Sequence, residues 1–135
     1  MTERKINLDL KKIDSAKKQG YWLEALLKNY QLNILLIRFL LKSGTKSPNQ
    51  EAVKIKHLMT LFIEEVSVNP DLKTIINKKN LKFVKPWLTK MEDFFKSMKQ
   101  GEIKQAKTLQ MESEKVFAVL HISAAKLLLK SKHSS

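Results

Sequence analysis

Candidates for acid–base chemistry gather in one stretch, PWLTKMEDFFKSMK, from Pro86 to Lys99. It alternates carboxylates and lysines with bulky apolar side chains, as an active-site helix or an ordinary packing helix can. The acids Glu92 and Asp93 are adjacent, as are Glu64 and Glu65. Adjacent residues on a helix point in different directions, so neither pair has the spacing of three or four by which helical bundles hold metals. We therefore interpret both pairs as charged solvent faces.

The histidines offer no clearer chemistry. His57, His121 and His133 share no metal-binding spacing with one another or with the acids. His121 has no acid within one helical turn, which favours a buried or half-buried structural role over a catalytic one. With no cysteine and three glycines, the chain lacks thiolate chemistry and glycine-rich phosphate loops. The sequence predicts no catalytic residue, no metal and no cofactor.

The net charge of +13 favours a polyanionic partner, which means nucleic acid, an acidic protein or an anionic membrane surface. Of 26 basic residues only Arg4 and Arg38 are arginine, and lysines attract phosphate without reading sequence. The lysines that we expect to meet phosphate lie around the stretch above: Lys78, Lys79, Lys82, Lys85, Lys90, Lys96 and Lys99. The alternative is a lysine-rich surface that is merely solvated.

Helix signals run along nearly the whole chain, and no strand period appears. We predict a first helix over 9–18, a break at Gln19–Tyr21, and a second helix from Trp22 to Lys42 that ends near Gly44. A cap signal at Ser47–Gln50 opens a third helix. Its apolar stripe is Ile55, Leu58, Met59, Phe62 and Val66.

Prolines and a glycine mark the predicted helix boundaries in the second half of the chain. NPD at 69–71 predicts a capped short helix to about Ile76, and NKKN at 77–80 a solvated loop. Pro86 starts or kinks a fourth helix that Gly101 ends. Its apolar face is Trp87, Leu88, Met91, Phe94, Phe95 and Met98. A fifth helix follows from Glu102 to Lys130.

These elements predict an all-α, up-and-down bundle of about five helices, four long ones and a short connecting helix. We expect one domain over 1–130 and a frayed C-terminal tail over 131–135. The apolar tract ILLIRFLL, Ile34–Leu41, is far shorter than the roughly 18 to 20 apolar residues of a membrane span. The polar N-terminus and the lack of cysteine lead us to expect a cytoplasmic protein.

The second helix is apolar around most of its circumference between Leu32 and Leu41. A helix tolerates this only when neighbours surround it or a second subunit covers one face. We predict a homodimer through this helix, with interface residues Asn29, Asn33, Ile37 and Arg38. Arg38 has a second interpretation, in which its stem covers apolar surface while the guanidinium meets water or a carboxylate.

Two segments of the chain, 16–41 and 81–98, resemble the HEPN superfamily of small helical bundles, which is widespread in prokaryotes. The first resembles the family's opening of a short helix, a glycine turn and a long apolar helix. The second resembles its penultimate helix, which in active members carries an arginine, a polar neighbour and then a histidine. The best register places Lys90 or Met91 at the arginine, Glu92 or Asp93 at the neighbour, and Phe95 or Lys96 at the histidine.

The resemblance implies a dimer in which the arginine and the histidine cleave RNA, in defence or toxin–antitoxin modules that pair with a nucleotidyltransferase. Both residues are missing here, and a free lysine, with a pKa of about 10.4, is a poor general base. We therefore expect a non-catalytic HEPN-like bundle that binds a polyanion or a cognate partner protein. The alternatives are an adaptor that oligomerises through its second helix, with no nucleic-acid role, and an enzyme that uses unrecognised residues.

Overall fold

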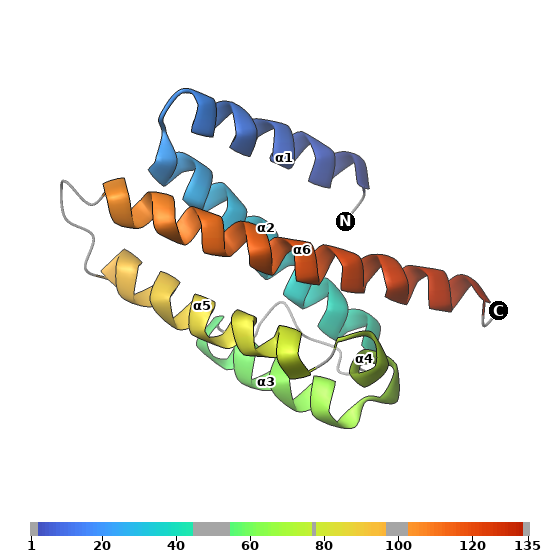
Figure 1. The fold of residues 1–135 in the computed structure, drawn as a ribbon. Helices are drawn as coiled ribbons and strands as arrows, with labels where there is room; N and C mark the ends of the chain where they lie inside the picture. The colour runs from blue at the N-terminus through green and yellow to red at the C-terminus, as the bar shows by residue number, and fades with distance from the viewer. Residues whose placement is uncertain (1–2, 45–54, 77, 97–102, 134–135) are drawn as a thin grey trace.

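The computed structural model describes residues 3–44, 55–76, 78–96 and 103–133, and these residues form helices joined by short turns, with no strand among them (Figure 1). The six described helices are α1 Glu3–Lys18, α2 Trp22–Gly44, α3 Ile55–Val68, α4 Pro70–Ile75, α5 Lys78–Lys96 and α6 Ile103–His133. The predicted all-helical bundle is confirmed. Of the described helices, none is both long and apolar enough to cross a membrane.

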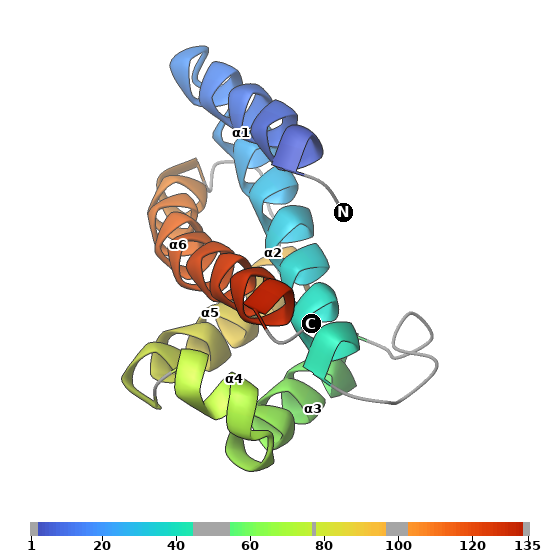
Figure 2. The same ribbon diagram turned by 90° about the vertical axis from the view of Figure 1, so that its right-hand side faces the viewer.

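The helices do not alternate strictly in direction. Figure 1 shows α1 and α5 running opposite to α2, α3 and α6, so that α2 and α3 run the same way. The predicted up-and-down order is therefore wrong at the connection between these two helices. In the view of Figure 2, α1 lies at one end of the molecule and α3 with α4 at the other, and α2 runs between them. The most extensive contact among the described helices is α2 against α6.

A glycine turn joins α1 to α2, as predicted. Gly20 has a φ of +80°, which glycine adopts at little cost. The N–H of Tyr21 donates to the carbonyl of Ala16 at 2.8 Å, and the N–H of Gly20 to that of Lys17 at 3.0 Å. This pair of bonds is a Schellman motif, which satisfies the last carbonyls of α1. The helix begins at Glu3, earlier than predicted.

The NPD signal is confirmed, because the side chain of Asn69 accepts from the N–H groups of Asp71 at 2.9 Å and Leu72 at 3.3 Å. The loop predicted over 77–80 is wrong at 78–80, because α5 begins at Lys78. Of the two roles predicted for Pro86, a helix start or a kink, the start is wrong, because Pro86 lies inside α5. The proline forfeits one hydrogen bond to the carbonyl of Lys82.

The core forms around α2. Leu26, Leu36 and Leu40 are completely buried by the chain's own helices, which explains why α2 is apolar on most sides. Asn29, Asn33 and Ile37 are also inside, with 2%, 0% and 0% of their surface exposed. This burial contradicts their predicted place in a subunit interface, because a second chain cannot reach their side chains in this fold. The side chains of Asn29 and Asn33 bond to Ser113 of α6 instead.

The end of the chain is more helical than predicted. The last helix continues to His133, so residues 131–133 are helical rather than frayed. The predicted cap at Ser47–Gln50, the predicted stop at Gly101, and Met98 with Lys99 lie outside the described residues.

Candidate nucleic-acid interface

The inner face of α5 is confirmed as a packing surface. Val84, Trp87, Leu88, Met91 and Phe94 are buried against the rest of the bundle. The outer face is basic, because the sequence of α5 carries six lysines and only two acids, Glu92 and Asp93. The predicted contact residues Lys79, Lys82, Lys85, Lys90 and Lys96 are all exposed. The described part of α5 therefore presents a basic surface, and its neighbours decide which lysines lie together.

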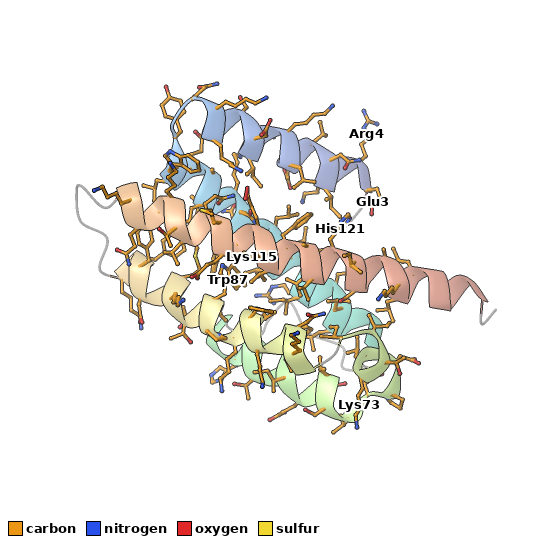
Figure 3. All side chains as sticks on the ribbon, in the orientation of Figure 1. Glu3, Arg4, Lys73, Trp87, Lys115 and His121 are labelled. Atoms are coloured by element: carbon orange, nitrogen blue, oxygen red, sulfur yellow. The ribbon has the colours of Figure 1, made fainter. Side chains whose placement is uncertain are left out.

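A groove of about 220 Å³ lies between α5 and α6, here called the α5–α6 groove. Its apolar lining comes from Phe83, Pro86, Trp87 and Val116. Its charged lining comes from Lys82, Lys90, Glu112 and Lys115. Figure 3 places the labelled Trp87 and Lys115 at this junction, the first on α5 and the second on α6. The groove thus combines an apolar base with three lysines and one carboxylate.

One lysine of the groove is already paired. The ammonium of Lys90 lies 3.0 Å from a carboxylate oxygen of Glu112, and the two side chains are 55% and 34% exposed. A pair this open to water contributes little to stability. It does neutralise the one acid in the groove. Among the described residues, Lys82 and Lys115 make no ion pair, so the groove carries two uncompensated positive charges.

The base of the groove is held by a buried hydrogen bond. The indole N–H of Trp87, which is 1% exposed, donates to the hydroxyl of Ser113 at 2.7 Å. The backbone carbonyl of Ser113 accepts from the amide nitrogens of Asn33 at 3.0 Å and Asn29 at 3.4 Å. The amide of Gln110 in turn donates to the side-chain oxygen of Asn29 at 3.0 Å. Polar bonds therefore connect α2, α5 and α6 beneath the groove.

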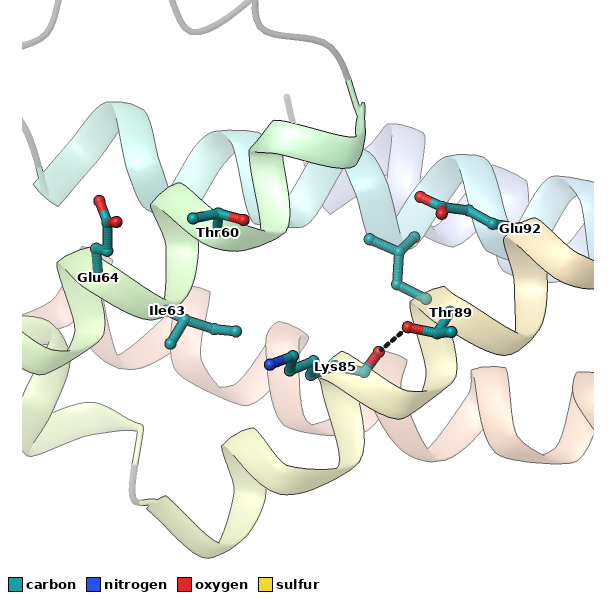
Figure 4. Close-up of a pocket in the computed structure, with 7 residues that line it drawn as sticks. Thr60, Ile63, Glu64, Lys85, Thr89 and Glu92 are labelled. Carbon is teal, nitrogen blue, oxygen red and sulfur yellow. Dashed lines mark hydrogen bonds between the residues drawn. The ribbon is translucent and has the colours of Figure 1, made fainter.

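A second pocket, of about 280 Å³, lies on the other side of α5, between this helix and α3. Figure 4 shows Lys85 directed into the space between the two helices, with Glu64 on α3 and Glu92 on α5 at opposite sides of the pocket. The hydroxyl of Thr89 donates to the carbonyl of Lys85 at 3.4 Å. Two carboxylates against one ammonium make this pocket net negative, so it repels phosphate. The structure thereby separates Lys85 from Lys82 and Lys90.

A third pocket, of about 390 Å³, lies where α1 meets α2. It is lined by Lys12, Lys28 and Glu24, and by Tyr21, which is 56% exposed. Its net charge is lower than that of the α5–α6 groove, because one acid offsets one of only two lysines. Like the α5–α6 groove, this pocket on the described surface brings lysines together with an exposed aromatic ring.

Of the seven lysines predicted to meet phosphate, the structure brings only Lys82 and Lys90 into one groove. Lys79 and Lys96 are exposed but line none of these pockets, the side chain of Lys78 is not described, and Lys99 lies outside the described residues. Sequence reasoning missed Lys115 and Phe83. Phe83 was detectable, because it falls off the inner face set by Val84, Trp87 and Met91. Lys115 was not detectable, because it reaches the groove only through the packing of α6 against α5, which the sequence does not show.

The histidines and Arg38 do not join this groove. His121 is half-buried, as predicted; its Nε2 lies 3.2 Å from a carboxylate oxygen of Glu3, and its ring stacks on Phe117 with centroids 5.0 Å apart. His57 is exposed. Arg38 is partly buried and near enough to Tyr30 to influence that phenol. Among the described residues, no three His, Cys, Asp or Glu side chains converge as a metal site would require.

One titratable group has a perturbed environment. Burial raises the pKa of the Tyr30 phenol above its ordinary value of 10.0, the carboxylate of Glu92 raises it further, and Arg38 lowers it. The ring of Tyr30 contacts those of Trp87 and Phe95, at centroid distances of 5.9 Å and 5.2 Å. Tyr30 therefore belongs to the aromatic core behind α5, where a neutral phenol is favoured.

No protein-family model matches this chain, and neither the curated proteins nor the solved structures include a significant match. The candidate interface therefore rests on its own geometry and charge.

Proposed function

We propose that this chain is a non-catalytic, HEPN-like helical bundle of the cytoplasm that binds nucleic acid through the α5–α6 groove. The observation that carries the proposal is the pair Lys82 and Lys115, which face one groove from two helices without a carboxylate partner among the described residues. The net charge of +13 adds long-range attraction for any polyanion.

Lysines at the groove bind phosphates as point charges. Each phosphate that is neutralised releases condensed counterions, so affinity falls steeply with salt and depends little on base sequence. Lys90 contributes less than Lys82 and Lys115, because its ammonium already contacts Glu112. The rigid base formed by Trp87 and Ser113 keeps the two free lysines on opposite sides of one groove.

The titratable groups of the groove support binding without turnover. They are three lysines and Glu112, and the carboxylate is bonded to Lys90. Of the two residues that the HEPN register places at the catalytic arginine, Met91 is buried and Lys90 is held in this pair. A lysine also lacks the planar guanidinium that grips phosphate through two parallel bonds.

The adaptor alternative loses its main support. It required α2 to present an apolar face to a second subunit, whereas Leu36, Ile37 and Leu40 of that helix are completely buried within the chain. A cognate acidic protein would use the same lysines as nucleic acid. A binding assay that contains only this chain and an oligonucleotide distinguishes a nucleic-acid partner from an acidic protein partner. A surface specific for a protein would not bind the oligonucleotide.

The test is fluorescence anisotropy of a labelled RNA, titrated with the wild-type chain and two double variants that have equal net charge. The first variant is Lys82→Gln with Lys115→Gln. The matched control is Lys73→Gln with Lys126→Gln, at exposed positions on α4 and α6 that do not line the groove. Figure 3 shows Lys73 far from Lys115.

We expect wild-type affinity to fall at least about tenfold between roughly 50 and 200 mM salt. The groove variant should bind more weakly and lose roughly 1.4 from the slope of log affinity against log salt, about 0.7 for each lysine. The control variant should keep a slope close to that of the wild type. Equal losses in both variants, or no binding by the wild type at low salt, would refute the proposal.

A further inference from the structure

We infer that the α5–α6 groove selects single-stranded nucleic acid, with a base stacked on the ring of Phe83 and the adjoining phosphates on Lys82 and Lys115. This inference rests on the proposed function and adds the class of nucleic acid. Its basis is the position of an exposed aromatic ring beside the two unpaired lysines in one groove.

Phe83 is available for stacking. It is 52% exposed, although phenylalanine on this helix is otherwise a core residue, as Phe94 shows at 2%. Its ring takes part in none of the ring contacts formed by the described aromatic side chains. Pro86 lies one turn further along α5 in the same groove and adds flat apolar surface. These two side chains can cover the face of a base.

The lysines stand where the backbone of a stacked strand would run. Lys82 is the neighbour of Phe83 in the chain, and Lys115 enters the same groove from α6. Proteins that bind single strands without sequence preference combine a basic groove with aromatic platforms in this way. Glu112 does not oppose the phosphates strongly, because its carboxylate is bonded to Lys90 at 3.0 Å.

A duplex cannot use this arrangement. Its bases are stacked on one another, so their faces are accessible only at the two ends, whereas the bases of a single strand can splay out onto an aromatic side chain. A duplex would meet the lysines alone and gain nothing from Phe83. The ring therefore predicts a preference for single strands that charge by itself does not supply.

The test compares three labelled probes of equal length: a single-stranded oligonucleotide, its duplex, and an abasic strand with the same sugar–phosphate backbone. The variant is Phe83→Leu, which keeps an apolar side chain but removes the aromatic face. The matched control is Tyr21→Leu, at the other exposed aromatic residue with lysines nearby, in the pocket where α1 meets α2. Circular dichroism establishes that both variants remain helical.

We expect the wild type to bind the single strand more tightly than the duplex or the abasic strand. Phe83→Leu should weaken single-strand binding about 5- to 150-fold, the range of one lost base–aromatic stack. Its binding to the duplex and the abasic strand, and its salt slope, should stay unchanged. Tyr21→Leu should bind all three probes as the wild type does.

Two results would overturn the inference while leaving the proposed function intact. One is equal binding of single strand and duplex that is insensitive to Phe83→Leu but sensitive to loss of Lys82 and Lys115. The other is a loss of single-strand preference in Tyr21→Leu instead, which would move stacking to the pocket at α1 and α2. Failure to bind any of the three probes at low salt would refute the proposed function itself.

Discussion

The indole of Trp87 and the hydroxyl of Ser113 are joined by a buried hydrogen bond of 2.7 Å between α5 and α6. Ser113 also presents its backbone carbonyl to the amides of Asn29 and Asn33 on α2. One residue of α6 therefore connects the base of the α5–α6 groove to the polar centre of the core. Ser113 does not itself line the groove, but it bonds to Trp87, which does.

Ser113→Ala should lower the free energy of unfolding by about 1–3 kcal/mol, because it leaves the buried N–H of Trp87 without an acceptor. The control is Ser123→Ala on the same helix. Ser123 is also buried, but its hydroxyl donates only to the carbonyl of Val119, at 2.7 Å. That variant should stay within about 0.5 kcal/mol of the wild type. Urea unfolding measures both, and equal losses would mean that the bond to Trp87 contributes nothing.

Asn33→Asp should be far more damaging. The side-chain amide of Asn33 is fully buried and donates to the carbonyl of Ser113 at 3.0 Å. A carboxylate there would lose this donor and face a carbonyl oxygen without a compensating cation, at a cost of roughly 3–5 kcal/mol. The comparison is Asn7→Asp, at an exposed position of α1, which should change stability little. Urea midpoints that coincide for the two variants would show that the network around Asn33 tolerates charge.

The pH dependence of stability should carry a contribution from Tyr30. Its pKa is raised above 10.0 in the folded chain, first by burial and then by Glu92, against the opposing effect of Arg38. Above about pH 10 the unfolded chain loses this proton more readily than the folded chain does. The contribution is therefore intact below pH 10, and stability falls as the pH rises towards the raised value.

Tyr30→Phe removes this titration, so its stability should fall less steeply than that of the wild type above pH 10. Tyr21→Phe is the comparison, because Tyr21 is more than half exposed and lies outside the aromatic core. It should retain the wild-type profile. Urea unfolding at a series of alkaline pH values measures all three chains. Parallel profiles for wild type and Tyr30→Phe would show that another group causes the decline.

Local sequence signals predicted a helix boundary correctly where a capping side chain and a backbone preference marked the same position. Asn69 and Pro70 mark the start of α4 in the sequence and in the structure. The error over 78–80 arose because the composition of Lys78, Lys79 and Asn80 indicates a loop. Packing decides otherwise, since α5 buries Val84 and Trp87, and burial of one face stabilises a helix beyond its intrinsic preference.

Only half of the candidate site could be predicted from the sequence, because the groove is lined by residues from two helices. The sequence identified Lys82 and Lys90 on one helix, but Lys115 comes from another helix. The same limit explains the error at Asn29 and Asn33. Polar residues on an apolar helix indicate a polar partner without saying where it lies. The partner here is the carbonyl of Ser113, which is 84 residues from Asn29 and 80 residues from Asn33 in the chain.

The turn between α1 and α2 allows a prediction about backbone conformation alone. Gly20 has a φ of +80°, and an added Cβ would meet no atom within 4 Å. Gly20→Ala should therefore destabilise the chain by roughly 1 kcal/mol through backbone strain, without any steric clash. Gly20→Asn should cost less, because asparagine adopts the left-handed region more readily.

Urea unfolding of the wild type, Gly20→Ala and Gly20→Asn should place them in the order glycine, asparagine, alanine, from most to least stable. This order of stability tests whether the backbone conformation at Gly20 is what sets the direction of α1. That helix contacts α6 through the ion pair of Lys17 with Glu114 and through the contact of Glu3 with His121. If alanine proved as stable as glycine, the positive φ would not be required, and the orientation of α1 would have to come from these two contacts and from the burial of Ile6 and Ile13.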